Sequence, residues 1–342
     1  MKDARLLVRI LRDPAAAAQL DERSWTGLIA AARAESLIGT LAHRVQDTAL
    51  PPRVAALLED ARLDAAQARA QALWEAEMAR RALAGVDAPV ILLKGTAYAA
   101  AGLDAAIGRS IGDLDILVPH DALPQVEQAL LAAGWEWVKE DAYDDLYYRR
   151  WMHELPPLIH RERDRMIDVH HTILPLTARP KPYPADLIDQ SVVLENGLRV
   201  LSPEHMIVHA AAHLIADGDL AGGLRNLWDI DRLCRAFSQE CEDFELSVVE
   251  EAFGHGLGTQ VLRALRLSRQ LFGTPLKAYS SPARFHFREQ FSDRFFRARL
   301  LARNGWGQET RKPLRLAFYA RSHLLRMPPL MLARHLWTKA RK

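Results

Sequence analysis

The stretch that decides the fold runs from residue 109 to residue 118 and reads Arg-Ser-Ile-Gly-Asp-Leu-Asp-Ile-Leu-Val. Its apolar residues, and the proline that follows at position 119, predict a buried strand over residues 111–118. Successive side chains of a strand point to opposite faces, so Asp113 and Asp115 share one face while Leu114, Ile116 and Val118 face the core. Two neighbouring carboxylates repel each other and are costly to desolvate, and a bound divalent cation relieves both costs.

A third acid follows in a similar setting. Residues 151–160 and 165–173 are predicted to be strands, and the charged turn at 161–164 between them indicates an antiparallel hairpin. Asp168 and His170 share one face of the second strand, and Asp168 converges with the first two acids if the hairpin lies beside them. Three carboxylates can hold two metal ions, one activating an acceptor hydroxyl and one stabilising a leaving pyrophosphate. We expect Mg²⁺ or Mn²⁺, with Asp168 doubling as the base.

The residues expected to bind phosphate precede these acids. Residues 88–95, Ala-Pro-Val-Ile-Leu-Leu-Lys-Gly, predict a buried strand, and a short helix is expected over 96–103. At such a junction a glycine allows close approach of the backbone to phosphate, and the helix N-terminus favours anions. Arg109 supplies a fixed positive charge that could grip a triphosphate. The predicted nucleotide-binding residues are therefore Lys94, Gly95, Thr96, Arg109 and His170.

Helices are expected on both sides of this core. Residues 1–85 have helical periodicity, with a long Ala-rich pattern from Val54 to Leu83. Helices return at Ser202, which is a predicted N-cap followed by a proline. Within the core we expect a helix over 121–133 capped by Asp121, and a strand over 135–139. The fold class is therefore α/β (α+β): a small mixed-sheet core at residues 86–178, flanked by helical regions at 1–85 and 179–342.

The composition of the 342 residues, 49% hydrophobic and 26% charged, is typical of a soluble globular protein. Charges at positions 2, 3, 5 and 9 leave no room for the apolar core of a signal peptide. No run approaches the roughly 18 apolar residues that a membrane-spanning helix needs. The two cysteines, Cys234 and Cys241, form no CxxC pair, so we expect a reducing, cytoplasmic location.

The charges are unevenly distributed along the chain. Residues 261–342 contain 19 lysines and arginines but only three acids. From residue 311 onward, arginines are interleaved with Leu, Phe, Tyr and Trp. Such a region can pack on the acidic body of its own chain, bind RNA or another anionic acceptor, or lie on an anionic membrane surface.

Three histidines, His205, His209 and His213, follow one another at intervals of four residues on a predicted helix. Zinc ligation by an H-E-x-x-H pair would need an acid at position 210, which is alanine. Packing, capping or lining of the active site are therefore the favoured interpretations. For Asp229 and Asp231 the favoured interpretation is solvent-facing charge beside a core tryptophan.

These motifs resemble those of the uncharacterised bacterial nucleotidyltransferases of the NTP transferase 5 type, in the DNA polymerase beta-like nucleotidyltransferase superfamily. The matching stretches are residues 91–96, 109–118 and 167–170, followed by 201–205, His209 and Asp229. The resemblance implies that Asp113, Asp115 and Asp168 are metal carboxylates and that Gly95 and Thr96 hold phosphate. Two positions depart from the pattern: Thr96 replaces the usual Ser or Gly, and His171 replaces an aromatic residue.

The expected reaction moves a nucleoside monophosphate from an NTP to a hydroxyl or phosphate and releases pyrophosphate. ATP is the NTP that we expect. A protein, a peptide, an RNA or a small molecule could each be the acceptor. Two alternatives remain. A glycosyltransferase also uses D-x-D but gives no role to Asp168 or Lys94. A nucleotide-binding or antitoxin-like module would keep the fold without turnover.

Overall fold

The computed structural model describes residues 4–139, 141–276, 283–329 and 331–333. Its centre is one mixed sheet of seven strands in the order β3-β4-β5-β2-β1-β7-β6, which confirms the α/β expectation. The β2–β5 and β1–β7 pairs are parallel and the others are antiparallel. The strands are β1 Ile91–Leu92, β2 Leu114–Leu117, β3 Trp135–Trp137, β4 Leu158–His160, β5 Met166–His170, β6 Val192–Val193 and β7 Arg199–Val200.

The centre of this sheet brings the two predicted acid-bearing strands together. β4 and β5 form the expected antiparallel hairpin, and β5 pairs with β2 in parallel. In that register Asp115 lies opposite Asp168, and Leu117 lies opposite His170. All four residues of β2 are buried, so this strand runs through the interior of the molecule.

Several predicted boundaries were wrong. The strand expected over 151–160 begins only at β4, because helix α7 (Ala142–Trp151) precedes it; Asp141 caps this helix by accepting from two backbone N–H groups. The helix expected over 121–133 is a 3-10 turn, η3 (His120–Ala122), followed by α6 (Leu123–Ala132). Asp121 therefore lies inside the turn and makes no cap. β2 and β3 are shorter than predicted, and α5 (Lys94–Ala100) begins and ends earlier than predicted. Asp113 lies just before β2 and not within it.

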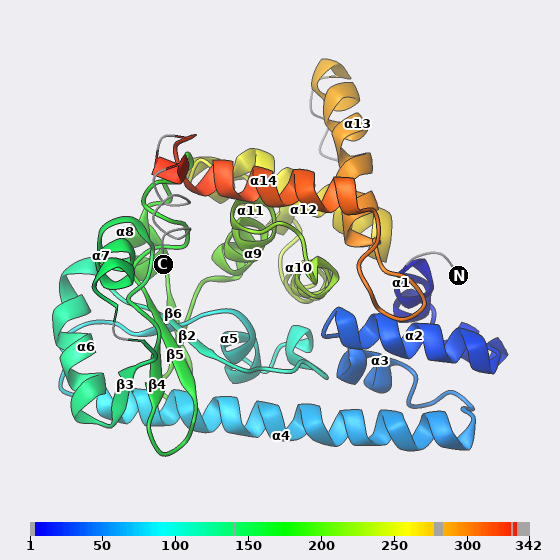
Figure 1. Cartoon of the computed structure of the whole chain (residues 1–342), viewed down its shortest axis with the longest axis horizontal. Coiled ribbons are helices and arrows are strands. Elements are labelled where there is room, and N and C mark those ends of the chain that lie inside the picture. The colour runs from blue at the N-terminus through cyan, green and yellow to red at the C-terminus, as the bar shows by residue number, and fades with distance from the viewer. Residues whose placement is uncertain (1–3, 140, 277–282, 330, 334–342) are drawn as a thin grey trace.

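The N-terminal helices form one side of the molecule. They are α1 (Arg5–Arg12), a 3-10 turn, α2 (Glu22–Ala34), α3 (Ile38–Arg44) and α4 (Pro52–Ala82). The 31-residue α4 confirms the long helical pattern and runs along the whole length of the molecule, beneath α3, α5 and the β4–β5 hairpin (Figure 1). Arg163 in the turn of that hairpin pairs with Glu75 of α4 at 2.8 Å, so the helix anchors the hairpin.

The helices after the core cover the other side. They are α8 (Pro184–Asp189), α9 (Pro203–Ala211), a π-helical turn η4 (Ala212–Asp217), α10 (Gly223–Phe237), α11 (Phe244–Gly254), α12 (Gly258–Phe272), α13 (Ala283–Leu300) and α14 (Lys312–Arg326). Ser202 caps α9 as expected, accepting from the His205 N–H at 3.3 Å. β6 and β7 extend the sheet past residue 178, while the division into three domains stays a prediction. Within the described residues, no helix combines the length and apolarity needed to span a bilayer.

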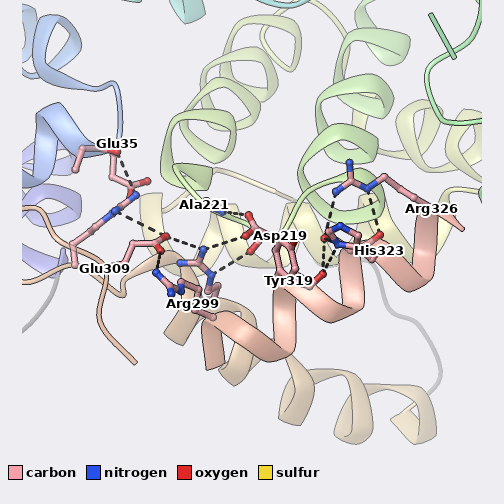
Figure 2. Close-up of polar contacts among 12 residues, drawn as sticks. Glu35, Asp219, Ala221, Arg299, Glu309, Tyr319, His323 and Arg326 are labelled. Atoms are coloured by element: carbon pink, nitrogen blue, oxygen red, sulfur yellow. Dashed lines mark hydrogen bonds and ion pairs between the residues drawn. The ribbon is translucent and has the colours of Figure 1, made fainter. Parts of the chain in front are cut away.

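The described part of the basic C-terminal region packs on the body of the protein. Arg299 of α13 contacts Glu309 at 2.9 Å and Asp219 at 3.6 Å, and Arg326 of α14 lies 3.5 Å from Asp217 (Figure 2). α14 lies across η4 and α13, on the same side as α9 and α12 (Figure 1). Of the three interpretations of this region, packing on its own core therefore holds for α14. Residues 334–342 lie outside the described part of the chain.

Candidate active site

Three carboxylates meet where β2 and β5 run side by side. Asp115 on β2 is 3% exposed, Asp168 on β5 is half-buried, and Asp113 is exposed just before β2. Each contributes an oxygen, and these oxygens all lie within 4.8 Å of one another. The predicted convergence of the three acids is thus confirmed. It follows directly from the parallel register, which sets Asp115 opposite Asp168.

Two nitrogen groups, the Lys94 ammonium and the His170 imidazole, contact the buried carboxylate of Asp115. Lys94 Nζ lies 2.6 Å and His170 Nε2 3.0 Å from the same Oδ1 atom. Burial acts to raise the pKa of Asp115, but the Lys94 charge and the His170 hydrogen bond outweigh it and hold that pKa well below its usual range. Burial likewise acts to lower the pKa of Lys94, and the charge of Asp115 reverses the shift. Both groups are therefore ionised.

Lys94 reaches Asp115 from an unusual backbone conformation. It begins α5 directly after β1 with a φ of 50°, in the left-handed region that non-glycine residues rarely adopt. Such conformations cost about 1–3 kcal/mol and are concentrated at functional sites. The sharp turn between β1 and α5 therefore points the ammonium group into the carboxylate cluster.

Asp168 has the opposite electrostatic setting. Burial, followed by the charges of Asp115 and Glu154, raises its pKa to about 7. Among the described residues, neither Asp168 nor Asp113 has an ion-pair partner. The cluster therefore carries more negative charge than Lys94 alone neutralises. Its three hard oxygen donors are the kind that Mg²⁺ and Mn²⁺ take, so the residues fit the expected metal.

Glu154 belongs to the same group of residues and was missed from the sequence. Its Oε2 atom lies 3.4 Å from His170 Nδ1, so His170 stands between Glu154 and Asp115. An isolated β-bridge joins the backbones of Glu154 and His170. Burial raises the pKa of Glu154. No motif surrounds Glu154, and it lies in the stretch wrongly expected to be strand, so only the fold reveals it.

Histidines surround the cluster on its buried side. The His153 ring lies 5.1 Å from the His170 ring, and His209 of α9 is 4% exposed. Burial lowers the pKa of both His153 and His209 well below the ordinary value, so both are neutral near pH 7. The charge of Lys94 adds to this shift for His209. Lining of the site, one of the interpretations of the histidine stripe, therefore suits His209.

The other predicted phosphate residues lie in the first turn of α5 or pack against it. Arg109 pairs through Nη1 with Asp229, and a Cβ on Gly95 would overlap with Arg109 Nε. Gly95 is thus needed to let Arg109 pass across the start of α5. Thr96 Oγ1 and Arg109 Nε are both buried without a hydrogen-bond partner among the described residues. The sites of two predicted phosphate contacts therefore carry unsatisfied polar atoms.

Residues 21–273, well over half of the chain, match the model of a family described as uncharacterised nucleotidyltransferase. The chain belongs to this family. The match to the nucleotidyltransferase family includes Lys94, the three acids, Glu154 and α9 to α12, and it confirms the resemblance found in the motifs. Nucleotidyl transfer is the general activity of such enzymes. No curated protein is significantly similar to the chain in sequence.

Two acids of α10, Asp229 and Asp231, lie in a different environment from the predicted one. Asp229 is 2% exposed and Asp231 is fully buried, so the expectation of solvent-facing charge was wrong. Asp229 joins Arg109 to Arg225, and Arg225 donates to Thr40 Oγ1 at 2.7 Å. α10 is packed between α9, α12 and the chain near α5, so even its polar side faces inward. A role for Arg109 in gripping the triphosphate stays a prediction.

Proposed function

We propose that this protein is a metal-dependent nucleotidyltransferase that moves an NMP from an NTP to an acceptor and releases pyrophosphate. The observation that carries the proposal is the convergence of Asp113, Asp115 and Asp168 within 4.8 Å, two of them without an ion-pair partner among the described residues. Three carboxylates with a surplus of negative charge suit a divalent cation and the phosphates that it binds. Mg²⁺ is the first choice and Mn²⁺ the second.

In this proposal the three acids hold the metal, which when bound neutralises triphosphate charge and favours ionisation of the acceptor hydroxyl. Asp168, whose carboxylate lies beside those of Asp113 and Asp115, takes the proton of that hydroxyl. The acceptor oxygen then bonds to the α-phosphorus as the bond from that phosphorus to the bridging oxygen breaks. The electron pair leaves with pyrophosphate.

The surrounding residues would position the triphosphate. Lys94 brings a positive charge to the cluster, and His170 orients Asp115 through the hydrogen bond at 3.0 Å. Among the described residues Thr96 Oγ1 and Arg109 Nε are buried donors without an acceptor, and phosphate oxygens are acceptors that would satisfy them. Glu154 acts through His170 and is therefore a positioning residue in this scheme. ATP is the donor that we propose to test first.

Transfer of label from each α-labelled NTP into protein, RNA and small-molecule fractions tests the proposal and names the acceptor class. We expect transfer with Mg²⁺ or Mn²⁺ for the wild type and none for Asp113→Ala/Asp115→Ala. Asp121→Asn, which removes an exposed acid outside the cluster, is the matched control and should keep full activity. Consumption of UDP-sugars without NTP turnover, or NTP binding without any product, would overturn the proposal.

A further inference from the structure

A second cluster of titratable side chains lies among the helices, and it shares no residue with the carboxylate cluster. It consists of Asp186 of α8, His205 of α9, and Glu251 and His255 at the end of α11. The two histidines are buried, at 0% and 1% exposed, while the carboxylates close the cluster on its half-buried side. Their four ligand atoms lie within 4.8 Å of one another.

The distances in this cluster match a four-coordinate metal site. The two Nε2 atoms of His205 and His255 are 3.0 Å apart, and their rings meet edge to face at 72°. His205 Nε2 lies 3.2 Å from Glu251 Oε2 and 3.6 Å from Asp186 Oδ2, which is 3.2 Å from His255 Nε2. Nitrogen and oxygen ligands of a tetrahedral zinc ion stand about 3.3–3.5 Å apart.

The cluster is poorly satisfied without a cation. His255 Nδ1 accepts from the Tyr183 N–H at 3.1 Å, so a neutral His255 carries its proton on Nε2, which lies 3.2 Å from Asp186 Oδ2 and 3.0 Å from His205 Nε2. If His205 also carries its proton on Nε2 and donates to Glu251, two N–H nitrogens stand 3.0 Å apart. If its proton is on Nδ1 instead, that N–H is buried without a partner among the described residues.

We propose that Asp186, His205, Glu251 and His255 bind one Zn²⁺ ion. Two imidazole nitrogens with two carboxylate oxygens form a donor set that zinc accepts and that Mg²⁺, which prefers oxygen, does not favour. Four protein ligands leave no open position, so the zinc is structural and does not activate water. Its role is to join α8, α9 and α11, which are far apart in the chain.

Loading of the zinc has one structural consequence. A neutral imidazole that binds metal through Nε2 carries its proton on Nδ1, and this nitrogen of His255 now accepts from the Tyr183 N–H. Zinc binding therefore opens that contact at the start of α8, the same short helix that supplies Asp186. The exposed position of Tyr183 lets the chain move there without disturbing the core.

Zinc titration of the full chain, stripped of metal beforehand with a chelator, tests the proposal. We expect one Zn²⁺ per wild-type chain, and after Co²⁺ substitution the visible ligand-field bands of a four-coordinate site. His255→Gln should weaken zinc binding by at least about 100-fold, since loss of even an outer partner of a metal ligand costs 10–100-fold. Asp113→Asn/Asp168→Asn, which alters the other cluster, should keep the zinc.

Two further variants keep the test decisive. His120→Gln is the matched control, because His120 and His171 also form an edge-to-face ring pair, with centroids 4.8 Å apart, but lie outside the cluster. Asp186→Asn alters the half-exposed ligand, so it should fold even if His255→Gln does not, and it should also bind zinc more weakly. Equal zinc affinity in the wild type and in Asp186→Asn, or a wild type that binds no zinc, would overturn the proposal.

Discussion

The two clusters of titratable side chains are built in different ways. The carboxylate cluster stands on neighbouring parallel strands, offers only oxygen, and leaves Asp113 open to solvent. The other cluster, called the histidine cluster below, consists of Asp186, His205, Glu251 and His255. It is assembled from three helices, offers two nitrogens and two oxygens, and buries both imidazoles. The first arrangement suits a hard cation that shares its ligands with substrate, and the second suits a closed site. The two clusters therefore differ in the type of donor atom and in their openness to solvent.

The largest effect is expected from changes to the two adjacent acids of the carboxylate cluster. Asp115→Asn should lower nucleotidyl transfer by at least about 100-fold and also destabilise the fold by about 1–3 kcal/mol, because Lys94 loses its buried partner. Asp113→Asn removes an exposed acid, so it should lower activity with little effect on the free energy of unfolding. Transfer assays and denaturant unfolding of both variants check this. Equal destabilisation by the two substitutions would contradict it.

Removal of zinc should change the Tm of the protein but not its transfer activity, and so distinguish the two clusters. If the histidine cluster holds a structural zinc, a zinc-selective chelator should lower Tm by several degrees, because loss of a ligand of the folded state destabilises it. Transfer measured with excess Mg²⁺ at 25 °C should change little, because the carboxylate cluster binds a different ion. Thermal scans and transfer assays with and without the chelator measure both effects. A chelator that stops transfer while leaving Tm unchanged would assign the zinc to the reaction centre.

Asp168 makes the free energy of unfolding of the metal-free protein depend on pH. Its pKa is raised from 3.8 to about 7, so between these values the folded, metal-free protein holds a proton that the unfolded chain releases. Stability from this group is therefore greatest below about pH 4 and falls as the pH rises towards 7. In EDTA at pH 8, Asp168→Asn should raise the free energy of unfolding by about 1–2 kcal/mol while abolishing transfer.

Urea unfolding of wild type and Asp168→Asn between pH 4 and pH 8 measures that difference, which should shrink as the pH falls. Asp121→Asn serves as the matched exposed control and should leave the unfolding curves unchanged at each pH. A constant difference between wild type and Asp168→Asn across this range would show that burial of the Asp168 charge is not its source.

The smallest effect is expected at Arg109, which lies outside the carboxylate cluster and pairs with Asp229. Arg109→Lys keeps the charge but loses the planar guanidinium that reaches Asp229 and crosses Gly95. We expect kcat/KM for the NTP to fall about fivefold, mainly through a higher KM, which corresponds to about 1 kcal/mol. Steady-state kinetics with varied NTP checks this. A change confined to kcat would place Arg109 at the reacting atoms.

The sequence predicted one cluster and could not predict the other, and the reason is physical. Asp113 and Asp115 are close because they are two residues apart, and the strand pattern and the motif resemblance led us to expect Asp168 beside them. The pairing that places Asp168 there, β5 with β2, is itself a long-range contact. Asp186, His205 and Glu251 meet only because three helices pack in a particular way. Within the stripe of histidines, His205 contacts Glu251 of α11, while burial, followed by the charge of Lys94, lowers the pKa of His209. The sequence could not separate these two settings.

The misplaced boundaries have a similar origin. The strand expected from Trp151 to His160 begins only at Leu158, because the helix that Asp141 caps runs to Trp151. Asp229 and Asp231 were misjudged because a charged residue ordinarily faces water. Their arginine partners come from outside the local motif or from neighbouring turns, and tertiary contacts alone reveal them.

Helix α4 connects two distant parts of the molecule. Its 31 residues give it a length of about 46 Å, and it touches α3 at one end and the β4–β5 hairpin at the other. Glu75 pairs with Arg163, and Gln71 accepts from Arg165, three residues before Asp168 on β5. α4 therefore links the N-terminal helices to the strand that bears the proposed base. A proline placed midway along α4 would act as a hinge and disconnect the two ends.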